Sequence, residues 1–412
     1  MLRLIVVDKL LSDNEIVFTY IESSHATPKY AVACWVKGQP KGAGFDAFIH
    51  ASDNDFTYEK CCQFEYKKIH PSQELAFKTL TEAGKVAKQQ GCDYIWIDHC
   101  CIDQSDTEYV TRSINLRYQW YAEAEVCLVY LHDSPLDSDP CKRLWICEER
   151  GCLWFHSTWS RPVILASKQL NFYDSAWKPI GTFQKQSSSD QRPLEGLGKE
   201  VQRITSIAPG ALLGSVPLSK YSVATRLVWA EEPIPFIEPP EDVAYSMVGI
   251  FGVSLTPNYG EGGNRAFHRL AAKIMQVTSD LSILAWKESC TILGSDEPLG
   301  ALPHPITDSI WPKYYRDFHP MPSNYPLSMT EKGVQVTAVL CKYKQPWKDG
   351  YFMSLGGSDI GGWYFGFDLR QIDQSTYERE SGWLGKVAAL KLTPSTGPMT
   401  FYITTHIKVS SD

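Results

Sequence analysis

The feature that most constrains this chain is the alternation, over residues 1–182, of short apolar runs with longer amphipathic segments. Residues 30–35 and 91–98 are two buried-strand candidates, and residues 72–90 between them are a helix candidate. Strand-like runs separated by helices are typical of a parallel sheet flanked by helices. The apolar positions of the helix candidate recur every three to four residues, as this requires: Leu75, Ala76, Leu80, Ala83 and Val86. The sequence therefore predicts an α/β domain over residues 1–182.

A third strand candidate, residues 125–131, follows a second helix candidate over residues 110–124. We expect the three strands to be neighbours in one parallel sheet. Ligands of open parallel sheets bind beyond the carboxyl ends of the strands, so the side chains there should share one cavity. These side chains are Cys34 and Trp35, residues 98–103, and His132 and Asp133.

The pattern changes twice after residue 182. Residues 184–193 are rich in Ser, Gln and Lys, which indicates a domain boundary. Residues 194–290 favour a helical domain, with residues 241–251 and 264–277 as its clearest helices and a glycine-rich turn at residues 260–263. Short alternating runs such as residues 333–340 predict a β-rich region over residues 330–412.

Charge and cysteine usage narrow the classes of partner and location. The chain has 47 Asp and Glu residues and 40 Lys and Arg residues, which gives a net charge of -7. It also has no long basic run, so the charge pattern argues against a nucleic-acid partner. No apolar run approaches the roughly 20 residues of a membrane span. Residues 1–7 meet Asp8 too early for a signal peptide, so we expect them to be a first strand. Twelve cysteines without C-x-x-C indicate reduced thiols, no metal site and a cytoplasmic location.

Several strings resemble the fungal heterokaryon-incompatibility (HET) domain. Residues 94–103, YIWIDHCCID, are the most specific of them, and residues 30–32, 120–127 and 130–133 accompany them. Four further strings resemble the region that follows such domains in fungal incompatibility-like proteins: residues 241–251, 259–262, 266–270 and 282–286. The resemblance covers residues 1–290 and, more weakly, the β-rich tail.

This resemblance implies a TIR-like doubly wound α/β fold and a role in fungal self/non-self recognition and programmed cell death. TIR-related domains can hydrolyse NAD with a glutamate near the nicotinamide riboside. The resemblance therefore implies NAD as a substrate, with no resident cofactor. The chemistry agrees, because breaking an N-glycosidic bond develops positive charge on the sugar, which a nearby carboxylate stabilises.

Two alignments of the family's glutamate motif, Trp-x-Leu-Gln-Glu at a helix start, stay open. One has no gap, takes Trp159 as the tryptophan and places Pro162 and Val163 at the Gln-Glu positions. The other uses residues 143–149, needs an insertion afterwards and places Glu149 at the glutamate. A second family motif, Ser-His-x-Trp-Gly, is here residues 34–38, CWVKG, without its histidine. If hydrolysis is retained, we expect Glu149 to perform it.

The other site residues follow from their chemistry. Asp98 and His99 join Glu149 as catalytic candidates, because a carboxylate orients ligand hydroxyls and an imidazole transfers protons near neutral pH. Each candidate has a structural alternative: Asp98 as a helix cap, thiols as small buried apolar groups, and aromatic rings as core. We expect a small-molecule ligand to contact Cys34, Trp35, Cys101, Asp103, His132 and Trp159.

Three functions from different classes follow. The first is a protein of the incompatibility or cell-death type that acts on NAD or a related nucleotide through a TIR-like pocket with an eroded catalytic motif. The second is a HET-fold enzyme repurposed for a small-molecule step in fungal secondary metabolism. The third is a non-catalytic interaction module that self-associates or docks a partner.

Overall fold

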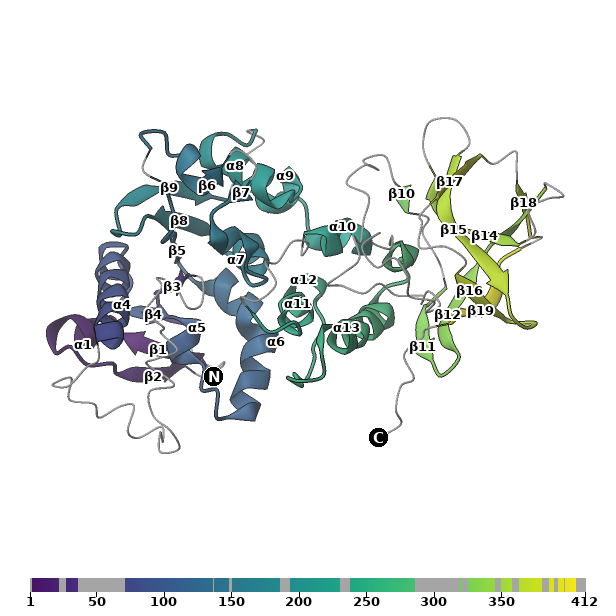
Figure 1. Cartoon of the computed structure of the whole chain (residues 1–412). Helices are drawn as coiled ribbons and strands as arrows, with labels where there is room; N and C mark the ends of the chain where they lie inside the picture. Colours follow the sequence, from purple (N-terminus) through teal and green to yellow (C-terminus); the bar gives the residue numbers. More distant parts are fainter. Residues whose placement is uncertain are drawn as a thin grey trace. The chain divides into compact units, whose positions relative to one another are not determined.

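The computed structural model describes residues 2–21, 27–35, 71–135, 137–147, 150–185, 193–229, 238–285, 319–320, 325–344, 350–357, 363–379, 385–388, 392–395 and 397–404. Cα packing divides the chain into two compact units (Figure 1). The first is Met1–Pro217 with Glu232–Asp242, and the second is Leu218–Glu231 with Val243–Asp412. The division into regions 1–182, 194–290 and 330–412 stays a prediction.

The first unit alternates strands with helices. Its strands are β1 (Leu2–Val6), β2 (Phe18–Ile21), β3 (Tyr30–Cys34), β4 (Tyr94–Trp96), β5 (Val126–Tyr130), β6 (Trp145–Cys147), β7 (Arg150–Gly151), β8 (Gln169–Tyr173) and β9 (Pro179–Gln184). Its α-helices are α1 (Val7–Ser12), α4 (Pro71–Gln89), α5 (Asp98–Cys101), α6 (Thr107–Glu123), α7 (Ser160–Ala166), α8 (Gly196–Thr205) and α9 (Pro209–Leu212). Two short 3-10 turns, η1 (Lys142–Leu144) and η2 (Leu153–His156), flank the β6–β7 hairpin.

Seven strands form one sheet in the order β2-β1-β4-β3-β5-β8-β9. Its four central strands, β4, β3, β5 and β8, are parallel, whereas β1, β2 and β9 pair antiparallel. The predicted parallel sheet is therefore correct at the centre and wrong at the edges. Parallel neighbours need a crossover of a dozen or more residues, and the short connection from β8 to β9, residues 174–178, allows only antiparallel pairing.

Helices cover both faces of the centre of this sheet. Figure 1 shows α1 and α4 on one side and α6 and α7 on the other. All five residues of β5 are buried, as expected for a parallel strand covered on both faces. Asp106 caps α6 by accepting a hydrogen bond from the Tyr109 N–H at 2.9 Å. The predicted α/β class is therefore confirmed for this unit.

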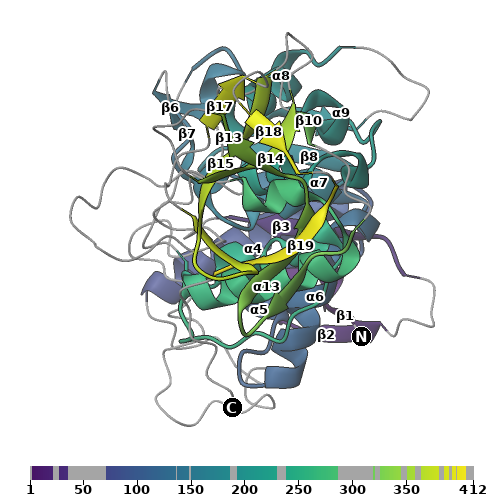
Figure 2. The ribbon, with the colours of Figure 1, turned by 90° about the vertical axis from the view of Figure 1, so that its right-hand side faces the viewer.

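The second unit combines short helices with a β-sheet. Its helical elements are η3 (Leu218–Lys220), α10 (Val223–Val228), α11 (Asp242–Tyr245), α12 (Val248–Phe251), α13 (Gly263–Val277) and η4 (Leu281–Leu284). Its strands are β10 (His319–Pro320), β11 (Ser328–Thr330), β12 (Gly333–Ala338), β13 (Leu340–Tyr343), β14 (Tyr351–Gly357), β15 (Trp363–Gln371), β16 (Thr376–Arg379), β17 (Gly385–Ala388), β18 (Leu392–Pro394) and β19 (Met399–Ile403). Figure 2 shows this curved sheet in green to yellow.

The sheet of the second unit is antiparallel except for the pairing of β16 with β19. Gly333 starts β12 with a φ of 120°, and a Cβ there would lie 2.1 Å from the Ile403 carbonyl oxygen. Only glycine fits this close approach of β12 to β19.

The helices of the second unit differ in part from the sequence prediction. The helix predicted over residues 264–277 is α13, and the predicted turn at residues 260–263 precedes it. The single helix predicted over residues 241–251 was wrong, because α11 ends at Tyr245 and α12 begins at Val248. Between them, the Ser246 hydroxyl donates to the Val243 carbonyl at 3.2 Å, a local bond that competes with helical pairing.

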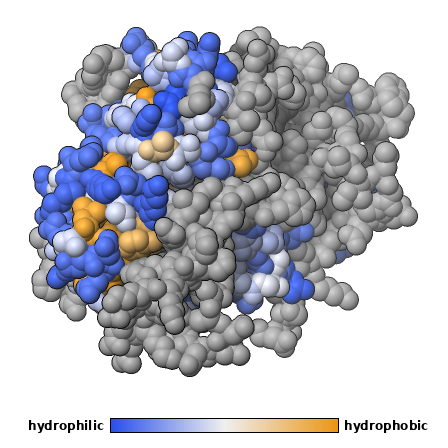
Figure 3. Space-filling model, turned by 60° about the vertical axis from the view of Figure 1, so that its left-hand side comes forward, coloured by the Kyte–Doolittle hydropathy of each residue, from blue (hydrophilic) through white to orange (hydrophobic). Residues whose placement is uncertain are grey.

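Within the described ranges, no helix is both long and apolar enough to cross a membrane. On the face that Figure 3 shows, the described residues are mainly hydrophilic with small apolar areas. Self-association stays a prediction.

Candidate functional site

The three strands predicted to carry the site are neighbours. β4, β3 and β5 lie in that order, with Val32 opposite Trp96 and Cys34 opposite Val129. Because all three strands run in the same direction, the residues that follow them leave the sheet at one edge. The predicted adjacency of the three strands is thus confirmed.

Asp98 begins α5 directly beyond β4 and meets His99. Its Oδ1 accepts a hydrogen bond from the His99 backbone N–H at 2.8 Å and also contacts His99 Nδ1. The His99 ring lies 6.4 Å from the Trp35 ring, centroid to centroid. The structure therefore brings Asp98, His99 and Trp35 together. The Asp98 side chain keeps 25% of its surface exposed, so solvent still reaches the carboxylate.

Arg117 of α6 is a buried cation beside this carboxylate, and the sequence patterns did not single it out. It is 7% exposed. Burial raises the pKa of Asp98, but His99 and Arg117 outweigh burial and hold this pKa at about 2. Asp98 is thus ionised at neutral pH. The missed signal was an arginine inside a helical apolar stripe, one turn after Ile114 and one turn before Tyr121.

Cys34 ends β3 next to a second thiol. Its Sγ lies 3.5 Å from the Sγ of Cys127 in β5. Burial, and then the neighbouring thiol, raises the pKa of Cys34 well above its ordinary value. The thiol is therefore protonated at neutral pH and is a poor nucleophile.

Among the described residues, no group of three or more His, Cys, Asp or Glu side chains is arranged to hold a metal ion.

Cys101, the last residue of α5, and Asp103 lie on the segment that Arg3 of β1 holds. Arg3 Nε donates to the Cys101 carbonyl at 2.9 Å, Arg3 Nη2 donates to the Cys100 carbonyl at 2.8 Å, and Arg3 Nη1 lies 3.9 Å from Asp103 Oδ2. The Cys101 thiol is fully buried, and burial raises its pKa to about 12. The surroundings of this thiol match its structural alternative, a small buried apolar group.

His132 follows β5 and has Asp133 as its charged neighbour. The His132 Nδ1 and Asp133 Oδ1 atoms lie 3.8 Å apart. Burial lowers the pKa of His132, although Asp133 opposes this shift. Asp133 also accepts a hydrogen bond from the Leu153 N–H at 2.7 Å, which ties this strand end to η2.

Trp159, immediately before α7, contacts the buried arginine. The Arg117 guanidinium lies 3.7 Å from the centre of the Trp159 ring. The indole Nε1 donates to Asp242 Oδ2 at 3.2 Å. Trp159 thus contacts the arginine whose charge lowers the pKa of Asp98, and its role in binding a ligand stays a prediction.

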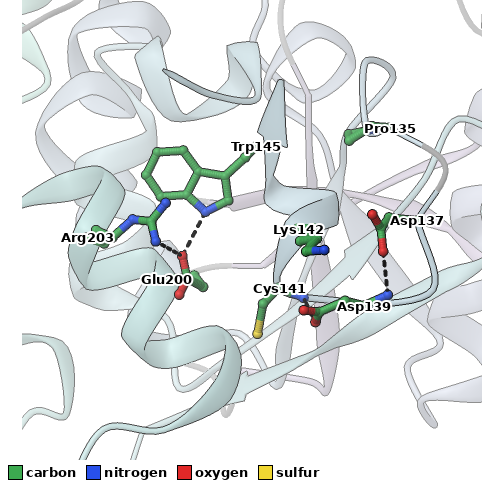
Figure 4. Close-up of a pocket in the computed structure, with 8 residues that line it drawn as sticks. All are labelled: Pro135, Asp137, Asp139, Cys141, Lys142, Trp145, Glu200 and Arg203. Atoms are coloured by element: carbon green, nitrogen blue, oxygen red, sulfur yellow. Dashed lines mark hydrogen bonds and ion pairs between the residues drawn. The ribbon is translucent and has the colours of Figure 1, made fainter. Parts of the chain in front are cut away.

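A separate open hollow of about 750 Å³ lies around Trp145 (Figure 4). Its described lining is Pro135, Asp137, Asp139, Cys141, Lys142, Trp145, Glu200 and Arg203. Trp145 Nε1 donates to Glu200 at 2.8 Å, and Arg203 stacks 4.0 Å from the Trp145 ring. None of the described candidates from the sequence lines this hollow.

The comparisons with known proteins address the first unit. Residues 50–176 match the family model described as "Heterokaryon incompatibility protein (HET)". This match defines the region that is called the HET domain in this chain. Over 221 residues the chain is 32% identical to the "Vegetative incompatibility protein HET-E-1" of Podospora anserina. The aligned region covers 49% of this chain and 15% of that protein. The chain therefore spans only a small part of the length of this relative. No solved structure matches the chain.

The two alignments of the family glutamate fall on different parts of the HET domain. In the ungapped alignment, Val163 stands at the glutamate position, and it is 2% exposed on α7. In the other alignment the motif, residues 143–149, covers the end of η1 and all of β6, and Glu149 lies outside the described residues. The role of Glu149 stays a prediction.

Glu238 and Asp242 contact the HET domain from more than 60 residues beyond its matched end at residue 176. No local sequence pattern predicts such contacts, because they join residues that are about 80 positions apart in the chain.

Proposed function

We propose that this chain acts in incompatibility-type cell death and that its HET domain binds NAD or a related nucleotide beyond the carboxyl ends of β3, β4 and β5. The observation that carries the proposal is the meeting of Asp98, His99 and Trp35 beside the buried Arg117. Nucleotides bind at this edge in doubly wound α/β folds. A TIR-like doubly wound fold is part of the same proposal, supported by the parallel centre of the sheet and by helices on both of its faces.

In this proposal, each residue has a distinct task. The ionised Asp98 accepts hydrogen bonds from ribose hydroxyls, His99 moves a proton, and the Trp35 ring packs on a flat base. Glu149 stabilises the positive charge that develops when the bond to nicotinamide breaks. The remaining lining comes from Cys34, Asp103, His132 and Trp159, whereas the fully buried Cys101 supports the site from within the fold.

The test is release of nicotinamide from NAD by the purified full chain. We expect release that the Glu149→Gln variant loses, since an amide cannot stabilise the charge. The matched control is Glu195→Gln, which removes an exposed carboxylate before α8 and should leave release unchanged. No release at high protein concentration removes the hydrolytic part of the proposal, and full release by Glu149→Gln removes the assignment of Glu149.

A second candidate is a non-catalytic interaction module, which the buried Val163 at the ungapped glutamate position favours. In that case, expression of the chain in fungal cells reduces viability although purified protein releases no nicotinamide. Glu149→Gln then kills as efficiently as the unchanged chain. The two candidates are therefore separated by measuring viability and nicotinamide release on the same variants.

A further inference from the structure

A segment far beyond the HET match returns to the first unit. Residues 218–231 pack with the second unit, whereas Glu232–Asp242 packs with Met1–Pro217. Of this returning segment, the structure describes residues 238–242. They contact the turn between η2 and α7, which contains Ser157, Thr158 and Trp159.

The carboxylate of Glu238 binds the start of this turn. It accepts hydrogen bonds from the Ser157 hydroxyl at 2.5 Å, from the Thr158 N–H at 2.8 Å and from the Thr158 hydroxyl. Ser157 and Thr158 are 8% and 6% exposed. Hydrogen bonds to a carboxylate acceptor are stronger than those to a neutral one, so Glu238 fixes the backbone immediately before Trp159.

Asp242 fixes the Trp159 side chain itself. It is 7% exposed and accepts the indole N–H at 3.2 Å. The opposite constraint on Trp159 is the Arg117 guanidinium, 3.7 Å from the centre of its ring. Arg117 in turn is one of the two groups that keep Asp98 ionised. A set of contacts thus runs from Asp242 through Trp159 to Arg117, and the charge of Arg117 acts on Asp98.

We propose that Glu238 and Asp242 are positioning residues of the HET-domain site: they hold Trp159, and through it Arg117, beside the Asp98 carboxylate. The inference rests on the proposed function, because it takes Asp98 as the ligand-binding group. The HET domain of this chain is then complete only when residues 238–242 are present. A piece that ends at the matched boundary, residue 176, lacks the two carboxylates that order its site.

The experiment measures the pKa of Asp98 by NMR in the full chain without any nucleotide. We expect Asp242→Asn to raise this pKa from about 2 toward its ordinary value of 3.8, because a neutral amide accepts the indole N–H more weakly and holds Trp159, and with it Arg117, less firmly. Trp159→Phe, which keeps a ring but removes the indole N–H, should raise it similarly. The double variant should match Trp159→Phe alone, because in this proposal Asp242 acts on the Asp98 pKa through this N–H.

The matched control is Asp280→Asn, which removes a carboxylate that accepts the Val223 N–H at 2.7 Å in the second unit. It should lower stability without moving the pKa of Asp98. An unchanged Asp98 pKa in a folded Trp159→Phe or Asp242→Asn variant would overturn the proposal and leave Glu238 and Asp242 as structural groups. Because this measurement uses no nucleotide, its result does not depend on whether the chain binds NAD. The positioning role and the nucleotide site can therefore be overturned independently.

Discussion

The HET-domain unit contains the same three-residue arrangement twice, once buried and once open. In the buried triad, Arg117 stacks on Trp159, and the indole donates to Asp242. In the open triad, Arg203 stacks on Trp145, and the indole donates to Glu200 (Figure 4). The separations of guanidinium and ring are similar, 3.7 Å and 4.0 Å, yet Arg117 is 7% exposed, whereas the Arg203 side chain is 58% exposed.

The two triads have the same arrangement of arginine, tryptophan and carboxylate, so burial is the property that distinguishes them. Water screens the charges of the open triad, so its contacts stay local. In the buried triad the effective dielectric constant is lower, and Arg117 acts on a further group, Asp98. The same substitution made at equivalent residues of the two triads should therefore have a larger effect in the buried triad.

The largest effect should come from the two arginines. Arg117→Leu removes a buried cation that is one of the two groups holding the pKa of Asp98 low, and we expect the free energy of unfolding to fall by about 3 kcal/mol. The equivalent change in the open triad, Arg203→Leu, should cost about 1 kcal/mol or less. Urea denaturation followed by fluorescence measures both. Equal losses would show that burial does not distinguish the two triads.

The next effect is an acid dependence that belongs to Asp98. Its pKa in the folded chain, about 2, lies below the ordinary 3.8, so the ionised form stabilises the fold above this range. This contribution, about 2 kcal/mol, is lost as the pH falls from about 4 to about 2. Stability measured across this range should fall less steeply in Asp98→Asn than in the unchanged chain. An identical pH profile for the two proteins would contradict the assignment.

A smaller difference should separate the two indole groups. Trp159→Phe leaves buried Asp242 without one hydrogen bond and should cost about 1 kcal/mol. Trp145→Phe changes a solvated contact and should stay within about 0.5 kcal/mol of the unchanged chain. Thermal unfolding of the pair at neutral pH tests this, and a larger loss for Trp145→Phe would reverse the ranking of the triads.

The smallest effect concerns His132 at the end of β5. Because burial lowers its pKa below 6.5, the unfolded chain binds this proton more readily than the folded one. Stability should therefore rise with pH up to about 6.5, and His132→Gln should flatten that part of the curve. An NMR titration of the His132 ring gives an independent check, and a pKa above 6.5 would refute the expected sign.

The sequence predicted the centre of this unit because the signal there is local. The apolar runs at β3, β4 and β5 and the helices between them follow from periodicity alone, and so does the position of Asp98 beyond β4. The antiparallel edges depend on connection length, which the strand pattern does not report. The role of Arg117 was not predicted, because hydrophobic periodicity identifies apolar positions and gives no reason to select a charged residue that lies among them. Glu238 and Asp242 act over about 80 residues, beyond any local signal.

The most direct test of the strand-end site is equilibrium binding of NAD to the full chain, measured by calorimetry. We expect saturable binding that Asp98→Asn weakens by about tenfold or more, as the loss of a charged hydrogen bond requires, and that Trp145→Phe leaves unchanged. Absence of binding, or equal affinity in Asp98→Asn and the unchanged chain, would contradict a nucleotide site at the ends of β3, β4 and β5.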